Sequence, residues 1–105
     1  MQVFVVLSTF PNPDKAAEVA RVLVEERLAA CVNLVPAVRS IYRWQGAVSD
    51  DSETLAVIKT TRDRYDALAA RVRELHPYEV PEMLALEVAA GHAPYLAWVG
   101  EQVAD

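Results

Sequence analysis

The segment His76-Pro77-Tyr78-Glu79-Val80-Pro81-Glu82 concentrates side chains that could bind a ligand. Two prolines stiffen a short stretch that carries an imidazole, a phenol and two carboxylates. Rigid loops with mixed polar groups are typical of binding sites, because functional residues are often held on loops. The alternative is a connector between a helix and a strand whose polar side chains are satisfied locally.

Cys31 is the only cysteine, so the chain can form no internal disulfide. Its thiol could ligate a soft metal, although a cysteine at the start of a strand is more often a small core residue. His76 could likewise bind a metal, or it could cap the last carbonyls of a helix. No neighbouring residue supplies the base that a cysteine nucleophile needs. The sequence therefore predicts that the protein is not an enzyme.

Charged residues between positions 39 and 59 have several interpretations. Lys59 emerges from an apolar run and either extends to solvent or is held for an anionic partner. Arg39 and Arg43 could pair with Glu53 across strands, with an acid on another subunit, or with an anion. The oxygen ligands of residues 50–53 lack the spacing of a calcium loop and indicate a solvated turn.

The apolar pattern predicts the elements that position these residues. A β-branched run predicts a buried strand over residues 2–9. Asn12 and Pro13 predict the start of an amphipathic helix that extends to about Leu28. A long strand follows over residues 31–44, although Pro36 suggests an irregularity. Without a bulge, one face of that strand would hold Val32, Leu34, Val38, Tyr42 and Trp44.

The second half of the chain repeats this plan. Residues 45–52 are predicted to form a turn and residues 53–61 a buried strand, so the two strands make a long hairpin. Thr61 can cap a second helix that ends at His76. A strand over residues 82–89 and a short terminal helix complete the order βαββαβα. This order predicts an α+β fold in a single domain, residues 1–105, with an antiparallel sheet covered by two helices.

The long hairpin also predicts self-association. Fourteen residues from Cys31 to Trp44 span about 46 Å as a strand, whereas a globule of this length is roughly 34 Å across. The hairpin should therefore overhang the body and expose Ile41, Tyr42 and Trp44 near its tip. Soluble monomers generally avoid such surfaces, so we expect these aromatic residues to pack on another subunit.

Composition excludes several classes of protein. The apolar fraction of 53% excludes a disordered chain. Fifteen acidic residues against ten basic ones give a net charge of −5, which disfavours nucleic acid as a partner. The apolar run at residues 3–7 is too short to span a membrane and lacks the flanks of a secretion signal. The sequence therefore predicts no membrane association and a cytoplasmic location, which also suits a lone cysteine.

Four segments resemble the successive signatures of the CutA divalent-cation-tolerance family. They are Leu-Ala-Ala-Cys-Val-Asn at 28–33, Ser-Ile-Tyr-Arg-Trp-Gln-Gly at 40–46, Lys-Thr-Thr at 59–61 and the His76 to Glu82 segment. Together they span nearly the whole chain in the family's order. The resemblance implies a ferredoxin-like fold assembled as a homotrimer through its long hairpins, similar in architecture to the PII signalling proteins.

The resemblance also implies an association with copper or another divalent cation, at a pocket between subunits. The metal ligands that it implies are Cys31, His76 and Glu79, and the ligand-binding residues are Tyr42, Trp44, Lys59 and Tyr78. Some bacterial relatives have a further cysteine where this chain has Ser8, which weakens a thiolate-rich copper site here. Three-fold symmetry could gather one ligand from each subunit, or join Cys31 of one chain to His76 of the next.

Two functions follow from this resemblance. The first is a trimeric cytoplasmic protein that binds divalent metal and contributes to metal tolerance and homeostasis. The alternative is a PII-like signalling module, in which Lys59, Arg43 and the 76–82 loop bind a small anionic ligand at the subunit cleft.

Overall fold

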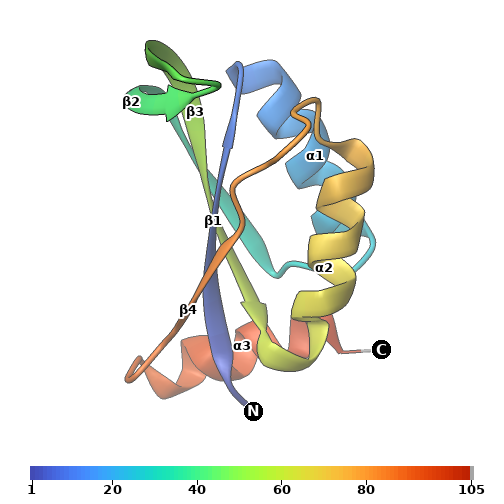
Figure 1. Cartoon of the computed structure of the whole chain (residues 1–105). Coiled ribbons are helices and arrows are strands. Elements are labelled where there is room, and N and C mark those ends of the chain that lie inside the picture. Colours follow the sequence, from blue (N-terminus) through green and yellow to red (C-terminus); the bar gives the residue numbers. More distant parts are fainter. Residues whose placement is uncertain (105) are drawn as a thin grey trace.

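Strands and helices alternate along the chain in the order βαββαβα (Figure 1). A computed structural model describes residues 1–104. The elements are β1 (Val3–Phe10), α1 (Pro13–Glu25), β2 (Cys31–Trp44), β3 (Ala47–Thr61), α2 (Arg62–Leu75), β4 (Leu84–Glu87) and α3 (Ala93–Val103). None of the helices within residues 1–104 has the length and apolar character needed to cross a membrane.

The four strands form one antiparallel sheet in the order β2-β3-β1-β4. Helices α1 and α2 cover one face of this sheet, and α3 lies near the end of β1 that starts the chain (Figure 1). The predicted α+β split βαβ arrangement, which is that of ferredoxin-like proteins, is thereby confirmed. We call the face that α1 and α2 leave uncovered the open face.

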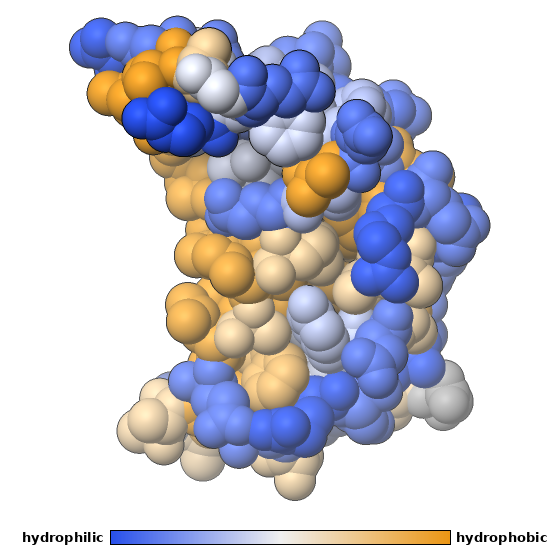
Figure 2. Space-filling view, in the orientation of Figure 1, coloured by the Kyte–Doolittle hydropathy of each residue, from blue (hydrophilic) through white to orange (hydrophobic). Residues whose placement is uncertain are grey.

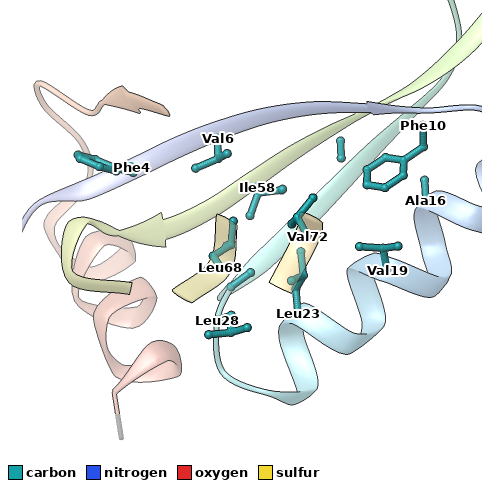
Figure 3. Close-up of a cluster of buried hydrophobic side chains, with 12 residues drawn as sticks. Phe4, Val6, Phe10, Ala16, Val19, Leu23, Leu28, Ile58, Leu68 and Val72 are labelled. Atoms are coloured by element: carbon teal, nitrogen blue, oxygen red, sulfur yellow. The ribbon is translucent and has the colours of Figure 1, made fainter. Parts of the chain in front are cut away.

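The core lies between the sheet and the two helices. Alternate residues of β1 point toward the helices, among them Phe4, Val6 and Phe10, each at most 7% exposed. They meet Leu23 of α1 and helix α2 in one apolar cluster (Figure 3). This alternation leaves the other residues of β1 on the open face.

Helix α1 begins as predicted and ends earlier. The Asn12 side chain caps it by accepting a hydrogen bond from the Lys15 amide at 2.8 Å. The helix stops at Glu25 rather than at Leu28, because Arg27 adopts a left-handed φ of 59°. The chain then turns back, and the Leu28 amide bonds the Leu23 carbonyl at 2.9 Å.

The hairpin turn is much shorter than predicted. Only Gln45 and Gly46 separate β2 from β3, both with positive φ (49° and 80°), as in a two-residue hairpin turn. The prediction of a turn over residues 45–52 was wrong, because residues 47–52 pair with β2. Asp50 lies within this ladder and accepts two hydrogen bonds from Arg39, at 2.9 and 2.7 Å. Arg39 therefore pairs with Asp50, not with Glu53.

A bulge interrupts β2 between Val35 and Val38. One extra residue lies opposite β3 there, and Ala37 takes a φ of 60°. The bulge exchanges the two faces of the strand, so the predicted continuous face does not form. Val32 and Leu34 pack on the core, whereas the alternation after the bulge places Val38, Tyr42 and Trp44 on the side of the open face.

The open face is apolar and concave. Its exposed residues include Leu84 and Leu86 of β4, which are 55% and 53% exposed, and Val35 of β2. Figure 2 shows this hollowed, largely apolar side between the hairpin and α3. The hairpin reaches beyond the body in Figure 1, and the chain measures 44 × 26 × 21 Å. Strand β4 is shorter than the predicted 82–89 and pairs with β1 from Leu7 to Phe4.

Candidate functional site

A pocket of about 520 Å³ lies between the hairpin and the loop that follows α2. It brings together four of the predicted site residues from distant parts of the sequence: Tyr42 and Trp44 from β2, and Tyr78 and Glu79 from the loop. The remaining lining residues are Thr9, Ser40, Glu53, Pro77, Val80 and Glu82. The stiff His76 to Glu82 segment thus forms one wall of a pocket and not only a connector.

Glu53 forms the floor of this pocket with Tyr78. The Tyr78 hydroxyl donates a hydrogen bond of 2.6 Å to the Glu53 carboxylate, and Glu53 is only 9% exposed. Burial and the neighbouring Glu53 charge raise the pKa of Tyr78 well above its usual range, so the phenol stays a donor. Sequence reasoning counted Glu53 among the oxygen ligands of a solvated turn, although it also placed residue 53 at the start of a buried strand. Its position at the start of that strand was the available signal for its burial.

Tyr42 and Trp44 form the wall that belongs to the hairpin. Tyr42 donates a 2.6 Å hydrogen bond to Asp51 on β3, and this bond raises the pKa of the phenol. The two side chains are two residues apart on one strand, so they lie on the same face. In one chain Tyr42 is 41% exposed and Trp44 is 44% exposed, so each ring keeps a part of its surface uncovered.

His76 lies beneath the loop and uses both ring nitrogens. Its Nε2 is 2.7 Å from the Thr9 carbonyl oxygen, and its Nδ1 accepts a hydrogen bond from the Tyr78 amide at 3.1 Å. Nε2 therefore carries the proton and donates to Thr9. The ring stacks on Phe10 at 4.3 Å and is 8% exposed. In one chain, His76 fixes the loop to β1, and metal binding would require it to release one of these bonds.

The burial of His76 predicts a pH dependence of stability. Burial lowers the pKa of this imidazole below its ordinary value of about 6.5, against the opposing effect of the Thr9 carbonyl. The unfolded chain then binds more protons than the folded chain as the pH falls below about 6.5. The contribution of His76 to the free energy of unfolding is therefore complete above that pH. It decreases as the pH falls toward the lower pKa of the folded state. Urea unfolding at pH 7.5, 6.5 and 5.5 measures the decrease.

The control for this experiment is His76→Gln, which has no titrating ring. The variant should be less stable at pH 7.5, yet lose less free energy of unfolding than the wild type between pH 6.5 and 5.5. Equal losses in the two proteins would show that another group causes the pH dependence.

Cys31 and Lys59 lie together, away from the pocket. They are partners across β2 and β3, and the Lys59 ammonium donates to the Asn33 side chain. Lys59 also pairs with Val5, whereas His76 bonds Thr9, four residues further along β1. Four residues of strand correspond to about 13 Å. Cys31 and His76 of the same chain are therefore too far apart to hold one metal ion.

The lining of the pocket is acidic. Glu53, Glu79 and Glu82 contribute carboxylates, and neither Lys59 nor Arg43 lies among the lining residues. Within residues 1–104, however, no group of three or more His, Cys, Asp or Glu side chains is close enough to hold a metal ion. The pocket thus attracts positive charge without forming a metal site within one chain.

Comparisons with known proteins agree on one family. The sequence profile described as "CutA1 divalent ion tolerance protein" matches residues 4–102. The chain is 54% identical over 97 residues to the divalent-cation tolerance protein CutA of Thermus thermophilus, covering 92% of this chain and 94% of that protein. It is also 54% identical over 91 residues to the human protein CutA, where it covers 87% of this chain but only 51% of the longer human protein.

Solved structures give the same result for the fold. The Thermus thermophilus divalent cation tolerance protein superposes with a TM-score of 0.94 at 51% identity, over 97% of this chain and 99% of that one. CutA from Xylella fastidiosa superposes with a TM-score of 0.96 at 39% identity, over 99% and 100% of the two chains. The fold described above is therefore similar to theirs along almost the entire length.

Proposed function

Because the chain belongs to the CutA1 divalent ion tolerance family, we propose that it contributes to metal tolerance as a cytoplasmic homotrimer that binds copper or another divalent cation. In this proposal the protein binds and does not catalyse. The observation that carries it is the apolar open face, which one chain leaves exposed and which bears Cys31.

The open face supports self-association. Exposed apolar patches that are larger than a few side chains usually mark an interaction surface. Here Leu84, Leu86 and Val35 are each more than two-fifths exposed. At the hairpin tip, Ile41 and Val48 are 66% and 67% exposed. A neighbouring copy seated in the hollow of Figure 2 would cover the first group, whereas Ile41 and Val48 lie on the opposite face of the hairpin from Tyr42 and would need a separate contact.

A shared metal site follows from the ligands available. One described chain has no group of three ligands, but three-fold symmetry presents every ligand three times. Cys31 is half-buried on the open face, where three-fold symmetry could bring its thiol together with its two copies. Thiolate and imidazole ligands favour copper and zinc over calcium or magnesium. The acidic pocket, in contrast, gives no support to the alternative of an anionic ligand at that position.

Native mass spectrometry of chelator-treated protein tests the proposal. Limiting copper(II) is added to the wild type, with zinc(II) in parallel because zinc has no redox chemistry. We expect a trimer that takes up one or three ions, and Cys31→Ser should remain a trimer but take up fewer. His92→Ala is the control, because it removes an exposed imidazole from a loop elsewhere. A trimer that stays bare, or a Cys31→Ser variant that binds like the wild type, would contradict the proposed site.

A further inference from the structure

The pocket presents three aromatic rings to one small space. Tyr42 and Trp44 come from the hairpin, and Tyr78 approaches from the loop. The faces of aromatic rings carry negative partial charge, so they attract a cation held within about 6 Å. Groups of such rings are the usual means by which proteins recognise alkylated ammonium ions. The rings therefore favour a cation that also has an apolar surface.

Hydrogen bonds hold two of these rings in place before a ligand arrives. Tyr42 is tied to Asp51 at 2.6 Å, and Tyr78 is tied to Glu53 at the same distance. His76 fixes the backbone of the loop through the Tyr78 amide. Because these groups are already ordered, binding would lose little side-chain entropy.

The carboxylates of the pocket suit a diffuse charge better than a metal ion. Glu53 is only 9% exposed, so its carboxylate lies in a partly desolvated environment. Its electrostatic attraction for a nearby cation is therefore stronger than it would be in water. Glu79 and Glu82 add charge from the loop. A metal ion needs several ligand atoms in direct contact, and no such group exists within residues 1–104. An ammonium ion with alkyl groups has no such requirement.

We propose that this pocket binds a small organic cation, an ammonium ion with alkyl substituents. Its volume of about 520 Å³ is typical of sites for small molecules and far exceeds what a metal ion needs. The ligand would lie against Trp44 and Tyr42, with its charge toward Glu53 and Glu79. This site goes beyond the proposed metal function, since Cys31 is outside the pocket.

A matched pair of probes tests the charge requirement. Choline and 3,3-dimethyl-1-butanol have nearly the same shape, but only choline is charged. Each is titrated into the wild-type protein in the presence of a chelator, while the indole N–H signal of Trp44 is followed by NMR. Choline should shift that signal saturably, and the neutral alcohol should bind at least about fivefold more weakly, as expected for loss of a cation–π contact and a carboxylate.

Substitutions test the position. Trp44→Leu should weaken choline binding about fivefold, with chemical shifts of the loop amides as the readout, and Trp44→Phe should retain part of the affinity. Glu79→Gln should also weaken it without changing the shape of the pocket. Trp98→Leu removes an exposed indole from α3 and is the control that should bind normally.

Three results would overturn the inference: equal binding of the two probes, no effect of Trp44→Leu, or no saturable response of the wild type to choline. The metal proposal is judged separately, since choline binding should persist in Cys31→Ser. Loss of choline binding with intact metal uptake would refute the organic-cation site alone.

Discussion

Leu86→Asp is expected to convert the proposed homotrimer into folded monomers. Leu86 lies on the open face and is 53% exposed in one chain, so the change removes no core contact. In the trimer the same position would be covered, and an uncompensated buried carboxylate costs several kcal/mol. About 4 kcal/mol corresponds to a thousandfold weaker association. Analytical ultracentrifugation over a range of concentrations measures the change.

Val24→Asp provides the matched control. Val24 is 43% exposed on α1, on the other side of the molecule from the open face, so the same change should leave the trimer intact. Circular dichroism should show that both variants keep their helices. A Leu86→Asp protein that sediments as a trimer would exclude the open face as the interface.

Phe10→Ala should have the largest effect on the stability of the chain itself. Phe10 is 1% exposed, points toward α1 in Figure 3 and stacks on His76 at 4.3 Å. Removing a buried phenyl ring typically costs about 3–5 kcal/mol through lost burial and the cavity left behind. The stability comparison is made in the Leu86→Asp background, so that subunit dissociation does not contribute to the measured free energy of unfolding.

The same substitution should also loosen the pocket. Without the phenyl ring, His76 loses the surface against which it stacks, and the loop that it anchors should exchange its amide hydrogens faster. Phe10→Leu is the comparison, because it retains most of the apolar volume but not the ring, and it should cost less. Equal stability losses in Phe10→Ala and Phe10→Leu would mean that the ring stack, not the cavity, dominates.

The sequence predicted a helix or strand well where one of its faces is buried, because burial of one face imposes a regular spacing of apolar residues. The start of α1 at Asn12 and Pro13 and the end of α2 before His76 are local signals, and both hold in the structure. Residues 47–52 were misassigned to a turn because an overhanging hairpin is exposed on both faces in one chain. A polar sequence is then compatible with either a strand or a loop. Only pairs across the two strands, such as Arg39 with Asp50, distinguish a strand from a loop here.

The candidate site was predictable in part. Motif resemblance selected Tyr42, Trp44, Tyr78 and Glu79, and the fold brings these four to one pocket. The separation of Cys31 from His76 depends on strand register, which no local pattern specifies. The position of Tyr42 and Trp44 on the same side as Glu53 depends on the bulge at residues 36–37, which shifts the pairing of the hairpin by one residue. Both features required the three-dimensional arrangement.

The contact between His76 and Thr9 also bears on aggregation. Strand β4 begins at Leu84, opposite Leu7, so the last part of β1 extends past its neighbour as a sheet edge. Unpaired edges invite strands from other molecules and can seed fibrils. The His76 imidazole already donates a hydrogen bond to the Thr9 carbonyl oxygen, so that oxygen is not free to accept one from another strand. The rings of His76, Phe10 and Tyr78 pack together beside it and obstruct the place where an incoming strand would pair. The residue that anchors the loop thus also protects the fold against edge-to-edge polymerisation.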